Sequence, residues 1–241
     1  MDKLIFLDTE TTGNDFFKDR LFQVSFSYQG KIVSQFFKPP LPISIKAQSI
    51  TNVTNKMLEG KPGFENSKMK KDLQKILKDN ILVAHNAQFD IAMLVQEGIE
   101  VPKFICTLKL ARFLDEDCII PEYNLQFLRY YYELDINVFA HDAKSDVLVL
   151  EGLFKKLFEI MLKTYKTEEA VIAKMMEVSS QPFLIKLFNF GKYKGRRVEE
   201  ILVLDKGYLE WLFLQKQQSG VEDEDWTFTL RYHLKIEEKK N

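Results

Sequence analysis

Residues 4–13 of this 241-residue chain, LIFLDTETTG, decide the fold and raise its main chemical question. The apolar run at 4–7 is typical of a buried strand, and it is followed directly by two carboxylates, Asp8 and Glu10. Side chains at positions i and i+2 of a strand share a face, so the two Cα atoms are expected roughly 6.5 to 7 Å apart on one side of the chain. Like charges at this spacing repel each other, which predicts a cation between them.

A hard divalent cation is the simplest partner for this pair of carboxylates. Mg²⁺ takes oxygen ligands and is typically held by a few carboxylates together with substrate phosphate and water. The alternative is a solvated strand end that leads into the turn Thr11-Thr12-Gly13. The Asp-x-Glu pattern does not separate these two interpretations by itself, so the evidence must come from carboxylates elsewhere in the chain.

The bulk composition limits the classes of function. The length allows one full domain and a small second one. The chain has 34 Lys plus Arg and 35 Asp plus Glu, so it predicts neither a polyanion-coating protein nor an acidic tail, and any nucleic-acid contact must come from a local patch. The two cysteines lack metal-finger spacing, and the apolar start is too short for a signal peptide or a membrane span. These features predict a cytoplasmic protein without membrane contact.

The hydrophobic pattern predicts a meander of strands followed by alternating helices and strands. Gln29-Gly30 is typical of a hairpin turn, and the prolines of KPPLPIS force an extended connection after the third strand. Strands paired first in hairpins and then alternating with helices favour a mixed α/β sheet. The expected elements are strands at 4–8, 20–28 and 31–37, a helix within 65–79, strands at 81–85 and around 104–108 with a helix near Asp90 between them, helices from 107 onward, and the longest helix at 143–165.

Two later stretches place further carboxylates at the starts of helices. In ILVAHNAQFDIAML (residues 81–94) a strand runs into a helix with Asp90 in its first turn, where the helix dipole favours a carboxylate; helix capping is the alternative role. In HDAKSDVLVL (residues 141–150) Asp146 lies on or beside the apolar stripe of the longest helix. An unpaired charge is costly to bury there, so this position also favours a cation.

The stretches FLDTETTG, HNAQFDIAML and HDAKSDVLVL, in this order, resemble the three motifs of the DnaQ-like 3′–5′ exonucleases of the DEDDh type. This type has a histidine five residues before the last aspartate. The resemblance covers roughly residues 2–165 and includes ITNVTNKMLEGKPGF and EYNLQFLRYYYELDI. It implies an RNase H-like fold, a mixed five-stranded α/β sheet flanked by helices. All five motif residues are present: Asp8, Glu10, Asp90, His141 and Asp146.

The resemblance also implies metal-dependent phosphodiester hydrolysis with two Mg²⁺ or Mn²⁺ ions. Two metals roughly 3.5 to 4 Å apart activate a nucleophile and absorb charge on the phosphate and leaving oxygen. By resemblance, Asp8 would bridge the ions, Glu10 and Asp146 would complete the nucleophile-side site, and Asp90 would support the other ion. His141 would be the general base, a role suited to a side chain that titrates near neutrality; its alternative role is to cap the long helix.

Three further residues are candidates for contact with the substrate. Thr11 and Thr12 are expected to contact the terminal nucleotide through backbone N–H and hydroxyl groups, as in similar enzymes, or alternatively to shape the turn after the strand. Asn86 is expected to contact the substrate or to tie down its own loop.

The stretches FNFGKYKGRRVEEIL (188–202) and GYLEWLFLQ (207–215) resemble the small domain that follows the nuclease domain in exonuclease X-like proteins. The expected organisation is a nuclease domain at 1–165, a charged helical connector at 166–180 and a small α+β accessory domain at 181–241. A basic turn in this segment suits phosphate contact; the alternative is a solvated hairpin turn whose aromatic side chains pack locally. Its cations are Lys192, Lys194, Arg196 and Arg197.

The resemblance therefore predicts a 3′–5′ exonuclease that releases nucleoside 5′-monophosphates from the 3′ end of a nucleic acid, in DNA repair or processing. DNA is preferred over RNA because of the exonuclease X-like tail. The alternatives are an exoribonuclease of the same family, a proofreading subunit of a polymerase, and a catalytically silent nucleic-acid-binding module. Similar family members are often dimers, so a homodimer is one expectation.

Overall fold

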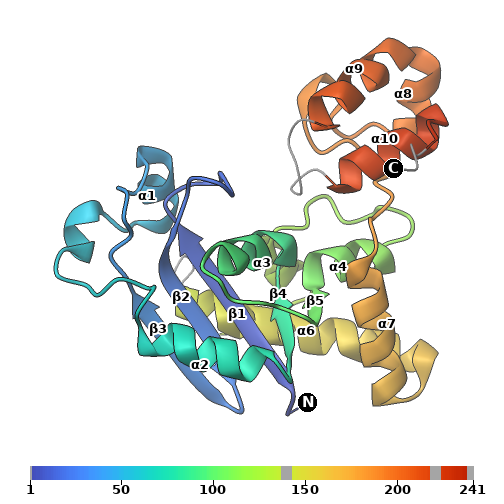
Figure 1. The fold of residues 1–241 in the computed structure, drawn as a ribbon. Helices are drawn as coiled ribbons and strands as arrows, with labels where there is room; N and C mark the ends of the chain where they lie inside the picture. The colour runs from blue at the N-terminus through green and yellow to red at the C-terminus, as the bar shows by residue number, and fades with distance from the viewer. Residues whose placement is uncertain (1, 137–142, 218–223, 238–241) are drawn as a thin grey trace. The chain divides into compact units, whose positions relative to one another are not determined.

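A computed structural model describes residues 2–136, 143–217 and 224–237 (Figure 1). The chain divides into two compact units. The first comprises Met1–Leu114 and Glu122–Ser179, and the second comprises Asp115–Pro121 and Ser180–Asn241. Within the described ranges, no helix is both long enough and apolar enough to cross a membrane.

The first unit is built on a five-stranded mixed sheet in the order β3-β2-β1-β4-β5. β1 pairs antiparallel with β2 and parallel with β4, β2 pairs antiparallel with β3, and β4 pairs parallel with β5. This confirms the predicted mixed sheet with an antiparallel meander at its start. The strands are β1 (Leu4–Thr11), β2 (Leu21–Tyr28), β3 (Lys31–Phe36), β4 (Ile81–Ala84) and β5 (Phe104–Cys106).

The helices of the first unit are α1 (Ile45–Thr51), the 3₁₀ helix η1 (Asn55–Leu58), α2 (Lys68–Leu77), α3 (Ala87–Gln96), α4 (Thr107–Leu114), α5 (Leu125–Tyr131), α6 (Ala143–Tyr165) and α7 (Glu168–Ser180). The helices from α2 onward follow the predicted order, whereas α1 and η1 lie in a segment for which no helix was predicted. The longest helix, α6, has the bounds that its apolar periodicity predicts, because its buried stripe is continuous from Val147 to Met161.

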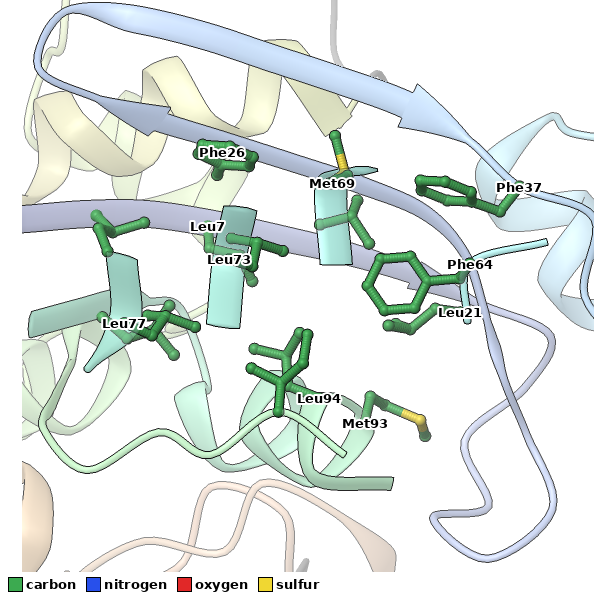
Figure 2. Close-up of a cluster of buried hydrophobic side chains, with 14 residues drawn as sticks. Leu7, Leu21, Phe26, Phe37, Phe64, Met69, Leu73, Leu77, Met93 and Leu94 are labelled. Carbon is green, nitrogen blue, oxygen red and sulfur yellow. The ribbon is translucent and has the colours of Figure 1, made fainter. Parts of the chain in front are cut away.

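β1 is the central strand and is covered on both faces. Leu7 belongs to a core cluster with Leu73 of α2 and Leu94 of α3, which Figure 2 shows gathered against the strands. The neighbouring Phe6 packs edge-on against Phe154 of α6, with ring centroids 5.3 Å apart. Because side chains alternate along a strand, even-numbered positions of β1 face α6 and odd-numbered positions face α2 and α3.

Helix α2 shows how local sequence sets these layers. Ser67 caps its N-terminus by accepting a hydrogen bond from the Lys70 N–H at 3.1 Å. Met69, Leu73 and Leu77 follow at i, i+4 and i+8 and are buried, so one stripe of the helix faces the sheet.

Helix α7 lies in the segment where a charged connector was expected, and it packs within the first unit. Val171, Met175 and Ser179 are buried. The Ser179 hydroxyl accepts a hydrogen bond from the backbone N–H of Cys106, at the end of β5, at 2.8 Å. This helix is therefore a structural part of the sheet-bearing unit.

The second unit is mainly helical in its described part. Its elements are the 3₁₀ helix η2 (Gly191–Tyr193), α8 (Val198–Leu204), α9 (Lys206–Gln217) and α10 (Glu224–Leu234). They enclose a core of their own around Phe188, Trp226 and Leu230. Among the described residues, the β character expected for this unit is limited to one antiparallel bridge between Leu187 and Arg197.

Candidate active site

The candidate site begins at the carboxyl end of β1. Asp8 and Glu10 continue the row of side chains that starts with Phe6, so both project toward the face of the sheet that α6 covers. Both are half-buried. β1 stays paired with β2 through this stretch, and the register shifts between Glu10 and Thr11, where the strand ends. Such irregularities often re-aim side chains beside active sites.

Asp90 reaches the same strand end from the opposite face of the sheet. It lies in the first turn of α3 and is only 4% exposed. The Thr9 hydroxyl donates a 2.7 Å hydrogen bond to its Oδ1 atom. Because Thr9 stands between Asp8 and Glu10 in β1, this bond ties Asp90 to the backbone that carries the other two carboxylates.

Asp146 is supplied by the first turn of α6. Its Oδ1 atom accepts a 2.6 Å hydrogen bond from Nε2 of Gln126 in α5. The position agrees with the prediction that Asp146 lies beside the apolar stripe of the long helix, since the neighbouring Val147 is fully buried.

The four carboxylates form one electrostatic cluster. Burial, reinforced by the charges of Asp90, Glu10 and Asp146, raises the pKa of Asp8 well above its usual range. Burial also raises the pKa of Glu10 to about 7, with repulsion from Asp146 and Asp90 adding to it. The pKa of Asp90 is raised to about 7, again mainly by burial, although the Thr9 hydrogen bond opposes the shift. The structure therefore brings together the four acidic residues that the sequence selects.

The chemistry of this donor set fits a hard divalent cation. Every donor is a carboxylate oxygen, and burial and mutual repulsion raise the pKa of Asp8 and Glu10, while burial raises that of Asp90, which a bound cation would offset. In the ranges that the structure describes, no three His, Cys, Asp or Glu side chains are already arranged to hold a metal ion. A bound cation would offset the repulsion among the carboxylates.

Two histidines, His85 and His141, lie in the motif segments. His141, the predicted general base, lies outside the described residues. His85 is held at the end of β4, with Nδ1 2.9 Å from the Thr107 hydroxyl and Nε2 2.8 Å from the Tyr123 carbonyl oxygen. Burial lowers the pKa of His85 to about 4, so it is neutral at physiological pH. Its contacts tie β4, α4 and the segment before α5 together.

The threonines after Glu10 shape the exit of β1. The Thr11 hydroxyl donates to the Gly13 carbonyl at 2.6 Å, and the fully buried Thr12 donates its hydroxyl proton to Asp19 at 2.6 Å and its backbone N–H to the Arg20 carbonyl at 3.0 Å. A Cβ atom at Gly13 would lie 2.4 Å from the Asp19 carboxylate, so a side chain there would have to displace the carboxylate that Thr12 contacts. These contacts support the alternative role of the threonines, shaping the turn.

Asn86 has a different environment. It stands at the N-cap of α3 in the left-handed conformation, with φ 62° and ψ 49°, and it is exposed. Its side chain makes no capping hydrogen bond to the helix. Asparagine tolerates this backbone conformation better than most residues, so the tight passage from β4 to α3 is one reason for its presence.

The basic turn of the second unit is held largely by its own contacts. Lys192 pairs with Asp205 at 2.9 Å and lies over the rings of Tyr193 and Tyr208. Arg196 pairs with a glutamate one helical turn later, at 2.8 Å. Two of the four cations are thus paired and the aromatic side chains pack locally, as the alternative interpretation of this turn predicts.

Sequence reasoning missed two residues of the site. Thr9 had a usable signal, because alternation along β1 places it on the face from which Asp90 approaches. Gln126 had none, since nothing in an isolated amide on a predicted helix reveals a partner 20 residues later.

The family model described as Exonuclease matches residues 5–154, and the model described as Exodeoxyribonuclease X-like C-terminal matches residues 188–217. Exodeoxyribonuclease 10 of Escherichia coli strain K12 is 33% identical over 194 residues, covering 76% of this chain and 79% of the relative. The PolC-type DNA polymerase III of Thermotoga maritima is 31% identical over 185 residues, covering 72% of this chain but 13% of the polymerase.

Solved structures give a consistent comparison. The structure of Exonuclease X in complex with 5′ overhanging duplex DNA matches with a TM-score of 0.55 and 27% identity, covering 73% of this chain and 99% of that one. Cell-death related nuclease 4 matches with a TM-score of 0.54 and 16% identity, covering 66% of this chain and 64% of that one, and supports the fold alone.

Proposed function

Because this chain belongs to the exonuclease family, we propose that its carboxylate cluster hydrolyses phosphodiester bonds from the 3′ end of DNA and releases nucleoside 5′-monophosphates. One observation supports DNA as the substrate. The C-terminal segment matches a family described as Exodeoxyribonuclease X-like C-terminal, and the chain covers 79% of its relative Exodeoxyribonuclease 10. A structure related to this chain, Exonuclease X, was solved with duplex DNA. These relatives do not favour the exoribonuclease alternative.

Members of this family generally depend on divalent metal ions. We infer that Asp8 would bridge two Mg²⁺ or Mn²⁺ ions, that Glu10 and Asp146 would complete one ion's site, and that Asp90 would support the other. When bound, such ions supply an activated water nucleophile and offset charge on the phosphate and leaving oxygen. The chain's own contribution is to hold four carboxylates at one strand end. Burial there disfavours their negative charges, and a bound cation would offset this cost.

His141 is proposed as the general base that takes the proton from the attacking water. It precedes Asp146 by five residues, the spacing of the DEDDh type. His85 is the other histidine of the motif segments, and its ring nitrogens are engaged by Thr107 and Tyr123. A role in proton transfer therefore suits His141 better than His85.

Contacts with the terminal nucleotide remain predictions for Thr11, Thr12 and Asn86. Asn86 suits a direct contact because it is exposed at the start of the helix that carries Asp90. The polar groups of Thr12 are used within the turn, so this residue would act by shaping the strand exit.

The proposal is tested by digesting a DNA oligonucleotide labelled at its 5′ end in the presence of Mg²⁺. Removal of nucleotides from the 3′ end predicts a ladder of labelled products that shorten one nucleotide at a time, with unlabelled 5′-monophosphates released. An RNA of matched sequence is expected to be digested more slowly. Immediate release of the 5′ label as a mononucleotide would contradict the proposed polarity, and faster digestion of RNA would contradict the proposed substrate.

A further inference from the structure

We propose that Gln126, oriented by Arg129, is a positioning residue that holds the Asp146 carboxylate in the cluster without neutralising its charge. The inference rests on the proposed function in that it assigns the cluster to divalent cations. It concerns α5, a helix that contributes none of the five motif residues.

A chain of hydrogen bonds crosses from α5 to α6. Gln126 Nε2 donates to Oδ1 of Asp146 at 2.6 Å. Gln126 Oε1 accepts from a guanidinium N–H of Arg129 at 3.4 Å. The other guanidinium nitrogen, Nη2, donates to the backbone carbonyl of Ile136. The chain therefore joins Asp146 to the backbone that follows α5.

The direction of these bonds is fixed by the chemistry of the two ends. A guanidinium group carries only donors, so it can meet only the oxygen of the Gln126 amide. That leaves the NH₂ group of Gln126 to face Asp146, whose carboxylate accepts hydrogen bonds. Arg129 thus sets which side of the amide Asp146 meets, and a glutamine flipped by 180° would place two acceptors together.

Arg129 is suited to orient another side chain because it is itself held firmly. It is only 8% exposed, and its guanidinium lies 5.2 Å from the centre of the Tyr130 ring. Its backbone partner, Ile136, is seated against α6 at Gly152, where an added Cβ atom would lie 2.5 Å from the isoleucine Cδ1 atom. A glycine inside a helix costs about 1 kcal/mol relative to alanine. The close approach of Ile136 explains why a glycine is present at position 152 of α6.

The Gln126 amide adds a hydrogen bond to Asp146 without adding a charge. Asp146 repels Glu10 and Asp8, and this repulsion acts to drive it out of the cluster. An arginine bound directly to Asp146 would oppose the repulsion, but it would also cancel the negative charge that a divalent cation needs. Gln126 holds one carboxylate oxygen while leaving that charge in place. Groups that orient metal ligands in this way typically contribute about 10- to 100-fold to metal affinity.

The test compares Mn²⁺ binding to the full-length wild type and to Gln126→Met by calorimetry. Methionine keeps the length and helix propensity of the side chain but removes its hydrogen bonds. We expect Mn²⁺ affinity to fall about 10-fold or more. In the DNA digestion, the Mg²⁺ concentration for half-maximal rate should rise by a similar factor, while KM for DNA at saturating Mg²⁺ stays within about 2-fold. Gln74→Met is the matched control, because Gln74 donates to the Gly98 carbonyl from α2.

A second variant, Arg129→Lys, keeps the positive charge but loses the planar guanidinium, whose two nitrogens bind Gln126 and the Ile136 carbonyl. It is expected to weaken Mn²⁺ binding by a smaller factor than Gln126→Met does. Circular dichroism of each variant checks that the chain is folded. Wild-type Mn²⁺ affinity in folded Gln126→Met would overturn the positioning role. Wild-type protein that binds Mn²⁺ but releases no nucleotides would instead contradict the proposed function, so the two failures are distinguishable.

Discussion

The fold buries three carboxylates, Asp8, Glu10 and Asp90, beside one another, and the pKa of each is raised. Asp90 of α3 is almost fully buried, and Asp8 and Glu10 of β1 are half-buried. Burial disfavours their charged forms, so in the absence of cations they destabilise the folded chain at neutral pH and above. Such strain is typical of sites that bind a charged ligand.

The pH dependence of stability follows from these pKa values. The pKa values of Glu10 and Asp90 are about 7 in the folded chain and about 4 in an unfolded one. Charging them therefore costs more in the folded state. We expect the free energy of unfolding of metal-free protein to rise as the pH falls from about 8.5 through 7, measured by urea denaturation in the presence of a chelator.

Asp90→Asn is the matched variant for this prediction. It removes the buried charge while keeping the side-chain size, so at pH 8.5 it should stabilise the metal-free protein by on the order of 2 kcal/mol and flatten the pH dependence. His85 has the opposite effect, because its pKa in the folded chain is lowered to about 4. Below about pH 6.5 it lowers the free energy of unfolding as the pH falls, and it does so in the wild type and the variant alike. A variant less stable than the wild type at pH 8.5 would contradict the assignment.

Residue types at fixed spacing point to three of the carboxylates of the candidate site. Asp8 and Glu10 follow from alternation in a strand, and Asp146 follows from a charge beside an apolar helical stripe. Gln126 was not predictable, because its role depends on how α5 lies against α6 and not on any local pattern.

At the scale of elements, boundaries were predicted well where one face of the element is buried. The apolar stripe of α6 runs from Val147 to Met161, about one turn from each end of the helix. β1 was expected at 4–8 but continues to Thr11, because its polar end still pairs with β2, with Asp8 opposite Ser25 and Glu10 opposite Gln23. Hydrophobicity alone cannot show a strand that persists through backbone pairing.

Helix α7 supplies a prediction at this scale. The buried Ser179 hydroxyl accepts from the Cys106 N–H at 2.8 Å and donates to the Met175 carbonyl at 2.6 Å. Ser179→Ala leaves that N–H without its partner, which should cost about 1 to 3 kcal/mol in the free energy of unfolding. Urea denaturation of the full chain measures the loss. Ser49→Ala, at an exposed hydroxyl on α1, is the control and should cost less than about 0.5 kcal/mol. Equal stabilities of the two variants would contradict a structural role for α7.

At the scale of the whole molecule, the chain combines a nuclease unit with a small helical unit that has its own core. The predicted homodimer remains a prediction. Within the described residues of the second unit, GKYKGRR forms a tight turn fixed by Lys192, Tyr193 and Asp205, and one antiparallel bridge joins Leu187 to Arg197. Side-chain pairing of this kind has no periodicity for a sequence pattern to detect.

The most direct measurement is the rate of mononucleotide release from DNA by wild type, Asp8→Asn and His141→Ala at saturating Mg²⁺ and with a chelator. A cluster that works through bound cations predicts chelator-sensitive release. Asp8→Asn should be slower by about 1,000-fold or more, and His141→Ala slower by about 100-fold or more, with Mn²⁺ binding retained in the histidine variant. Release that persists with the chelator, or an Asp8→Asn rate within about 10-fold of wild type, would contradict the account.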